Sequence, residues 1–379
     1  MDRKDNMSSK EAPVSIPTSA GQLGIRDRQE RRLIRNPRVP YSDSHRDPVG
    51  FFRRHWEMLA QTGQNRTQAV IGIDGLVSQE PVTRTVLRTS VSDNVLEDIL
   101  SNNLKSDLEV AVDISEFTGE THPDWFIYMA KNAPNRDKPA VPIEQMIAET
   151  EGGFRPITSP RERVLEVVNK GGSFIDSFAQ EQIPQILSLW QKAFGWTENE
   201  VVAFRDKLEA DKQKPISKRD MWFSGVMMDG KIVTASMAEC LPIRTLDGED
   251  KKIWELTEWV AAPAYRDQHL MTATIDMLNA QVISGSREAE NGTDPFIYAE
   301  VNHHTHAERV AHGAGLIIPE RHIKGTIVNQ ILVKNVSVGN GDPGMPLRDF
   351  HFVYLPKAEI NTAYTPNQIT IMLNQINTR

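Results

Sequence analysis

The chain has 379 residues, of which 39% are hydrophobic and 25% charged, and its formal net charge is -8. This length suits about two domains with tails, and the acidic balance argues against a nucleic-acid partner. A lone cysteine, Cys240, excludes an intrachain disulfide framework and a cysteine-rich zinc site, so we expect a reducing, cytoplasmic setting. No apolar run is long enough for a membrane span.

The N-terminal part is expected to hold a tail and an α/β region whose fold the sequence does not identify. Residues 1–45 are polar and charged, which predicts a disordered tail. Within 46–160, a helix-like apolar stripe at Gly50–Leu59 and a helical pattern at Asp93–Leu104 accompany strand-like alternation. The expected strands are 70–73, 82–91, 108–114 and 125–129. Prolines and glycines in Asn132–Pro160 predict a linker.

Beyond Gly171 the order of the expected elements becomes informative. Asp229-Gly230 is typical of a hairpin turn between two strands, and Thr197 followed by Glu200 is a capping-box pattern that predicts the start of a helix. The expected strands are Phe174–Phe178, Asp220–Met228, Lys231–Ile243, Lys252–Ala261 and Pro295–Val301. The expected helices are Gln180–Phe194, Glu198–Ala210, Leu270–Ile283 and His304–Gly313. Closing strands complete a β-α-α-β-β-β-α-β-α-β order.

Two local segments in this order resemble the GNAT superfamily of N-acetyltransferases. The run Glu258–Met271 holds a valine, a Pro-x-Tyr-Arg turn and the start of a helix. Asn302 then follows a strand and precedes a helix that ends near Gly315-Leu316. The resemblance is confined to the C-terminal half, residues 171–357, and leaves 358–379 as a C-terminal extension. It implies an α+β fold with a mixed, mostly antiparallel central sheet flanked by helices.

The resemblance also implies an activity. Members of the family move an acetyl group, or another short acyl group, from acyl-CoA to a primary amine of a small molecule or a protein. Acetyl-CoA is the implied donor, no metal ion is implied, and a homodimer is left open. Two alternatives remain: a non-catalytic binding module with a decayed cofactor loop, and an acyltransferase that takes its acyl group from an acyl carrier protein.

The implied cofactor site is a strand followed by a helix N-terminus. The pyrophosphate of CoA needs several converging donors, which the N–H groups and dipole of a helix N-terminus supply. The pantetheine amides would pair with the preceding strand. The implied cofactor-binding residues are Val260, Arg266, Asp267, Gln268, His269, Leu270, Met271, Thr272 and Asn302. Family members usually place glycine at the positions of His269 and Met271, where bare backbone approaches the phosphates.

The candidate catalytic residues are two glutamates and one histidine. An attacking amine must lose a proton, which requires an acceptor. Glu255 lies eleven residues before Arg266, the spacing of the general-base glutamate in related enzymes, and Glu258 lies nearer the strand end. Because side chains alternate along a strand, we expect the two on opposite faces, and a surface role is the alternative for either. Ala311 occupies the usual proton-donor position of the family, so His312 is the substitute candidate.

Two further clusters have simpler interpretations. His303 and His306 share a helical face, but without a helical carboxylate as a third ligand we expect a solvated or capping cluster rather than a metal site. Trp190, Phe194 and Trp196 stand where the family gates its acceptor. Burial in the core is the simpler expectation for most of them, because aromatic side chains bury large apolar areas.

Overall fold

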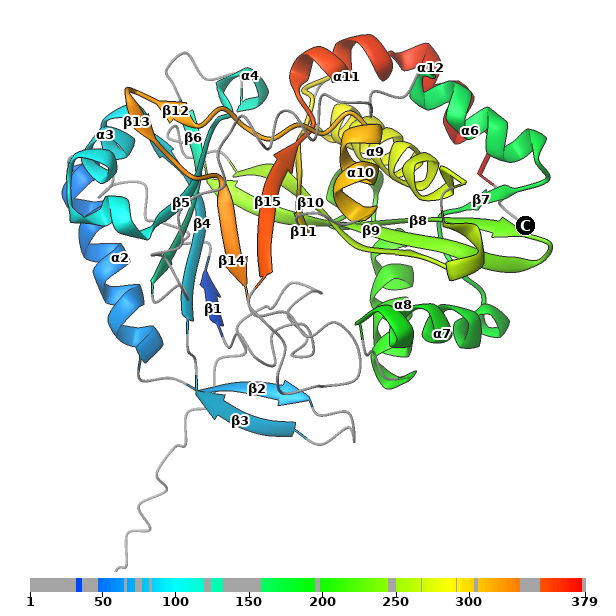
Figure 1. Cartoon of the computed structure of the whole chain (residues 1–379), viewed down its shortest axis with the longest axis horizontal. Helices are drawn as coiled ribbons and strands as arrows, with labels where there is room; N and C mark the ends of the chain where they lie inside the picture. The colour runs from blue at the N-terminus through cyan, green and yellow to red at the C-terminus, as the bar shows by residue number, and fades with distance from the viewer. Residues whose placement is uncertain are drawn as a thin grey trace, which may run out of the picture.

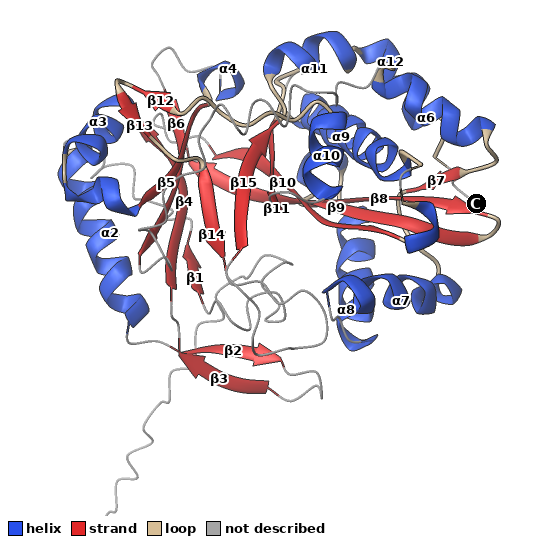
Figure 2. Ribbon diagram, viewed as in Figure 1, coloured by secondary structure: helices blue, strands red, loops and turns tan. Residues whose placement is uncertain are grey.

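The computed structural model describes residues 32–35, 47–64, 67–71, 77–81, 84–118, 124–131, 158–194, 198–244, 250–266, 268–290, 292–302, 306–334 and 348–376. Two sheets, one in the N-terminal region and one in the C-terminal half, pack against each other in the middle of the molecule (Figure 1). Helices cover their outer faces (Figure 2). The linker predicted at Asn132–Pro160 lies outside the described residues up to 157.

The N-terminal sheet has four strands in the order β1-β4-β6-β5. Its strands are β1 (Arg32–Arg35), β4 (Arg84–Ser92), β5 (Leu108–Asp113) and β6 (Asp124–Lys131). β1 pairs parallel with β4 and lies within the segment predicted as a tail. The other elements of this region are α2 (Pro48–Gln64), α3 (Asp93–Ser101), η2 (Asn103–Asp107), α4 (Ser115–Thr118) and the ribbon of β2 (Thr67–Ile71) and β3 (Val77–Pro81). α2 and α3 pack on one face of the sheet through Trp56, Leu96 and Ile99.

The C-terminal sheet has seven strands in the order β14-β15-β11-β10-β9-β8-β7. Its strands are β7 (Ser173–Ile175), β8 (Met221–Met228), β9 (Lys231–Arg244), β10 (Asp250–Ala261), β11 (Phe296–Asn302), β14 (Ile331–Lys334) and β15 (Arg348–Tyr354). Every neighbouring pair is antiparallel except β10 and β11, which are parallel. The expected α+β fold with a mixed, mostly antiparallel central sheet is confirmed.

Helices lie on both faces of this sheet, with α9 and α10 on one side and α7 and α8 on the other (Figure 1). Their bounds are α7 (Ile183–Phe194), α8 (Glu198–Lys212), α9 (Leu270–Ala289) and α10 (His306–Gly313). Short turns η3 (Gln180–Gln182), η4 (Ile216–Lys218) and η5 (Pro263–Tyr265) and the ribbon of β12 (His322–Ile323) and β13 (Thr326–Ile327) complete this half. The capping box proposed at Thr197 lies outside the described residues.

Three helices outside the expected set pack around α9. They are α6 (Pro160–Asn169), α11 (Lys357–Ala363) and α12 (Pro366–Leu373). α6 falls between the predicted linker and the predicted domain, and its start carries a complete capping box of Ser159 and Glu162. That pattern was readable in the sequence. The predicted C-terminal extension forms α11 and α12, and α12 contacts both α6 and α9.

Burial explains why α9 needs these neighbours. Almost all of its side chains from Leu270 to Ile283 are buried, so the helix has no solvent-facing stripe. A helix of this kind must be covered on every side. The C-terminal sheet covers one side, and α6 and α12 cover another.

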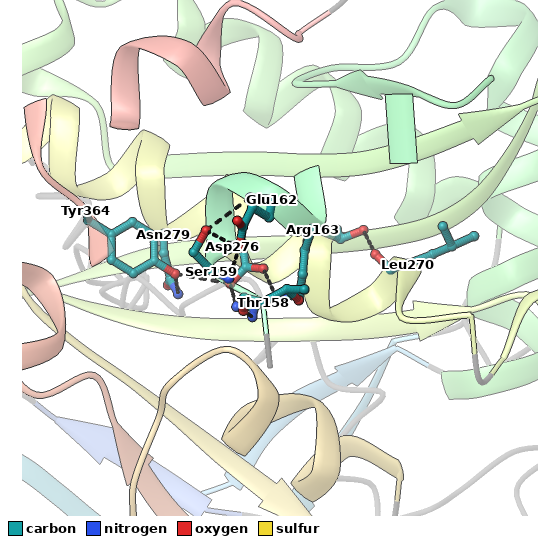
Figure 3. Close-up of polar contacts among 9 residues, drawn as sticks. Thr158, Ser159, Glu162, Arg163, Leu270, Asp276, Asn279 and Tyr364 are labelled. Carbon is teal, nitrogen blue, oxygen red and sulfur yellow. Dashed lines mark hydrogen bonds and ion pairs between the residues drawn. The ribbon is translucent and has the colours of Figure 1, made fainter. Parts of the chain in front are cut away.

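A buried polar network joins these helices at Asp276 of α9 (Figure 3). Arg163 of α6 donates from Nε and Nη2 to the two carboxylate oxygens of Asp276, at 2.7 and 2.9 Å. The Tyr364 hydroxyl donates to the same carboxylate at 3.2 Å and accepts from Asn279 Nδ2 at 3.1 Å. Complete burial raises the pKa of Asp276, and the neighbouring Arg163 guanidinium acts against that shift. The bidentate geometry keeps this buried charge paired.

We predict that Arg163→Met lowers the free energy of unfolding by about 3–5 kcal/mol, because it leaves the Asp276 carboxylate buried without a cation. Adding Asp276→Leu to that variant should recover most of the loss, since no unpaired charge then remains. Urea unfolding of the two variants and of Asp276→Leu alone gives the coupling energy. A double variant as unstable as the sum of the two single variants contradicts this interpretation.

Candidate functional site

The central feature of the C-terminal sheet is the place where β10 and β11 separate. Their parallel ladder joins Ile253–Leu256 to Phe296–Ala299 and ends there. Both strands continue, β10 to Ala261 and β11 to Asn302. Beyond the ladder, the facing edges of the two strands carry N–H and C=O groups that an extended ligand with amide groups can pair with.

A bulge in β10 coincides with this separation. The pairing of β10 with β9 shifts register between Thr257 and Val260. Glu258, inside the bulge, has a φ of 59° and is only 1% exposed. A left-handed backbone is costly for a residue with a Cβ, and such strain often marks a functional position. Because a bulge bends its strand, it turns the end of β10 away from β11.

The opening leads to the first turn of α9. One short turn, η5, separates the end of β10 from Leu270, where α9 begins. The first helical hydrogen bond runs from the Ala273 N–H to the His269 carbonyl at 3.1 Å. The N–H groups of Leu270, Met271 and Thr272 therefore have no acceptor one turn earlier, and the helix dipole makes this end positive. Together these features suit an anionic group such as a phosphate.

The loop before α9 and its first turn hold the two positions, His269 and Met271, where the resemblance to the GNAT superfamily led us to expect glycine. His269 has a φ of 57° and a ψ of 9°, a left-handed conformation that glycine adopts without strain. Met271 is 9% exposed and belongs to the core cluster, so its side chain packs inward. Arg266, Gln268 and His269 are exposed.

The remaining expected cofactor residues lie around the same opening, with one exception. Val260 follows the bulge and is buried with residues of α7 and α8. Asn302 is the last residue of β11, on the opposite strand of the opening. Gly313, at the end of α10, approaches Thr272 so closely that a Cβ there would lie 3.1 Å from Thr272 Cγ2. Asp267 lies outside the described residues.

Glu255 lies on the face of the sheet opposite α9. It stands directly across from Glu239 of β9 and beside Tyr298 of β11. Its Oε2 accepts from Arg88 Nη1 at 2.6 Å, and the same Nη1 lies 2.9 Å from the Tyr298 hydroxyl. Arg88 belongs to β4 of the N-terminal sheet, 167 residues away in the chain. No local sequence pattern signals such a contact, so Arg88 was not among the expected site residues.

Charge accumulates around Glu255. Glu300 Oε1 lies 3.9 Å from Arg88 Nη1, and the Nζ of Lys207, on α8, lies 3.9 Å from Glu239 Oε1. Glu239, Glu255 and Glu300 are all on this face, because Glu300 is two residues beyond Tyr298 on β11. Among the side chains that the structure describes, three carboxylates thus face one buried guanidinium and one half-exposed ammonium group. The excess of negative charge suits a cationic ligand such as a protonated amine.

His312 has the properties of a neutral imidazole. Its Nδ1 lies 3.0 Å from the Leu316 carbonyl, which can only accept, so Nδ1 carries the proton and Nε2 is an acceptor. Burial lowers the pKa of His312, although the Leu316 carbonyl and Glu308 act in the opposite sense. A neutral His312 with this tautomer can accept a proton but is a poor donor near neutral pH.

Several other sequence candidates lie in the core or outside the described part. Trp190 is fully buried against Phe178 and Phe223, which makes it a packing residue. Burial also raises the pKa of the Cys240 thiol, so it is unreactive. His303 and Trp196 fall outside the described residues. Within the part of the chain that the structure describes, no group of three metal-binding side chains could hold an ion.

The described helices also bear on a membrane location. Among them, none combines the length and the apolar character needed to cross a bilayer.

Comparison with known proteins gave matches among solved structures. The ribosomal-protein-S18-alanine N-acetyltransferase of Escherichia coli is 16% identical, with 49% of this chain and 93% of that chain covered and a TM-score of 0.30. An N-acetyltransferase of Staphylococcus aureus is 11% identical, with 48% and 97% covered and a TM-score of 0.33. The PaiA N-acetyltransferase of Thermoplasma acidophilum, in complex with coenzyme A, is 10% identical, with 48% and 98% covered and a TM-score of 0.28.

These similarities extend over about half of this chain. No family model matches the sequence, and no curated protein matches it either.

We predict that His269→Gly stabilises the chain by about 0.5–1 kcal/mol, because glycine relieves the left-handed strain at the start of α9. The matched control is His269→Ala, which removes the same imidazole and keeps the strained backbone. Thermal unfolding should rank His269→Gly above His269→Ala. The reverse order would mean that the imidazole, and not the backbone, determines the stability of this loop.

Proposed function

We propose that the C-terminal half transfers an acetyl group, or another short acyl group, from acyl-CoA to a primary amine of a small molecule or a protein. The observation that carries this proposal is the separation of β10 from β11 toward the first turn of α9. An extended donor with amides at its centre and a pyrophosphate at one end matches a strand edge beyond the end of a ladder, followed by a helix N-terminus.

The residues present fit such a donor. The N–H groups of Leu270, Met271 and Thr272 and the exposed Arg266 would hold the pyrophosphate. The end of β10, at Val260, and Asn302 on β11 would flank the pantetheine. Acetyl-CoA supplies the acyl group as a thioester, and the protein has to position the amine and accept its proton.

Glu255 is the proposed proton acceptor. The guanidinium of Arg88 lies 2.6 Å away and favours the ionised carboxylate, so Glu255 can act as a base at neutral pH. The amine nitrogen gains positive charge as it forms its bond to the acyl carbon, which makes its proton easier to remove. Glu258 lies at the strained bulge and is the second candidate. The lone, unreactive Cys240 fits the cytoplasmic location that we also propose.

Acetyl-CoA should bind and stabilise the chain. A ligand at about a hundred times its dissociation constant stabilises by roughly 2.7 kcal/mol, which thermal unfolding detects. Arg266→Glu should weaken binding about tenfold in titration calorimetry, because it reverses a charge beside the phosphates.

The matched control is Lys218→Glu in η4. Lys218 is exposed, as Arg266 is, and η4 contacts α9 without belonging to the loop that precedes α9. Reversing the charge of Lys218 should therefore leave the affinity for acetyl-CoA unchanged. Equal effects of the two variants would contradict the loop assignment. If CoA, acetyl-CoA and longer acyl-CoAs all fail to stabilise the chain, two other interpretations become better. The chain is then a non-catalytic binding module, or it takes its acyl group from an acyl carrier protein.

Glu255→Gln should lower turnover by about a hundredfold or more, the usual scale for a positioned base. The loss should shrink as the pH approaches the pKa of the amine, because solvent then supplies the neutral amine. His312→Ala should cost much less, since a neutral imidazole is not needed as a proton donor if CoA leaves as a thiolate. Rates of both variants across pH decide this. A Glu255→Gln variant as active as the wild type at neutral pH would leave Glu258 or bulk water as the acceptor.

A further inference from the structure

The N-terminal sheet contributes an arginine to the face that carries Glu255. Side chains alternate along β4, so Leu87 and Val91 point to the cluster with α2 and α3, whereas Val86 points to the C-terminal sheet. Arg88 shares the face of Val86 and is 2% exposed. A charged side chain buried in the contact between two sheets needs a compensating partner.

Among the described residues, the side chains that Arg88 contacts belong to the C-terminal sheet. They are Glu255 at 2.6 Å, the Tyr298 hydroxyl at 2.9 Å and Glu300 at 3.9 Å, each measured from Nη1. Burial raises the pKa of Tyr298 well above its usual value, with Glu255 acting in the same sense and Arg88 in the opposite one, so the hydroxyl stays protonated. Arg88 is the buried cation that the described part of the chain brings to this cluster, and its shortest contact is with the proposed base.

We propose that Arg88 is a positioning residue of the acyl-transfer site: it orients the Glu255 carboxylate and keeps it ionised. This inference rests on the proposed function. It assigns the N-terminal region a part in the reaction, because the guanidinium that bonds Glu255 comes from β4 of the N-terminal sheet. A purely apolar contact between the two sheets would have joined them without placing a charge there.

The prediction concerns the acid limb of the pH–rate profile. Removing the Arg88 cation makes the buried Glu255 harder to ionise, so activity should be lost at a higher pH than in the wild type. The variant leaves unchanged the other titratable groups that the described part of the chain places at this cluster. They are Tyr128 of β6, Lys207 of α8, Glu239 of β9, and Tyr298 and Glu300 of β11.

The test uses the full chain with acetyl-CoA and four acceptors of different kinds: tyramine, putrescine, spermidine and a lysine-containing peptide. Release of free CoA thiol gives kcat across pH. For Arg88→Met we expect kcat at pH 7 to fall about tenfold or more and the acid limb to move up by about 1–3 pH units. Arg88→Lys keeps the charge but not the planar fork, so it should restore most of the pH profile and only part of kcat.

The matched control is Arg163→Met, which removes an equally buried guanidinium from a carboxylate on the other side of α9. It should lower the melting temperature without moving the acid limb. If Arg88→Met does not fold, Arg88→Lys decides: a kcat equal to that of the wild type overturns the inference. The inference is also overturned if the acid limb of the pH–rate profile of Arg88→Met lies at the wild-type pH. It is likewise overturned if Arg163→Met moves the acid limb as far as Arg88→Met does.

The failure of the proposed function is recognised separately. A wild-type chain that neither binds acetyl-CoA nor releases CoA with any of the four amines overturns the proposed function, and this inference with it. An active wild type with an unmoved limb in Arg88→Met overturns the role of Arg88 alone.

Discussion

The early end of the ladder between β10 and β11 is the constraint on which the rest of the C-terminal half depends. Two parallel strands that stay paired to their ends leave no backbone groups for a ligand, whereas these two separate after Leu256 and Ala299. The bulge around Glu258 bends β10, and α9 then begins within a few residues of the end of that strand. The strand edge, the helix N-terminus and the loop between them therefore meet at one place.

Two strained residues stand on either side of this place. Glu258 and His269 both have a left-handed backbone although neither is glycine. Each costs on the order of 1 kcal/mol or more, which the surrounding packing has to offset. β9 and β10 pair on both sides of the bulge, and α9 is buried along nearly its whole length. The strain is thus held by the most firmly packed elements of the domain.

Two buried guanidinium groups connect the outer parts of the chain to this domain. Arg163 links α6, and through Tyr364 the C-terminal helices, to Asp276 on the side of α9 away from the sheet. Arg88 links the N-terminal sheet to Glu255 on the opposite face. Buried ion pairs add little net stability compared with apolar contacts, but breaking one is costly. Such pairs therefore fix how the parts dock more than they contribute to the total stability.

The sequence by itself determined the local elements and their order. Apolar periodicity, the Asp229-Gly230 turn and the run from Pro263 to Leu270 predicted the strands, the hairpin and the start of α9, because such signals act over a few residues. The capping box before α6 is an equally local signal, although this helix lies outside the set expected from the sequence. Alternation along the strand predicts opposite faces for Glu255 and Glu258, but a local pattern does not reveal the bulge that contains Glu258 and breaks that alternation.

Only the tertiary structure decided what surrounds the candidate residues. The contact of Arg88 with Glu255 and that of Arg163 with Asp276 span 167 and 113 residues of sequence. The left-handed backbone at Glu258 and the tautomer of His312 likewise depend on distant packing and on one carbonyl. A sequence pattern fixes which face a side chain occupies. The partner that meets it there, and therefore its charge state, is set by how the sheets and helices pack.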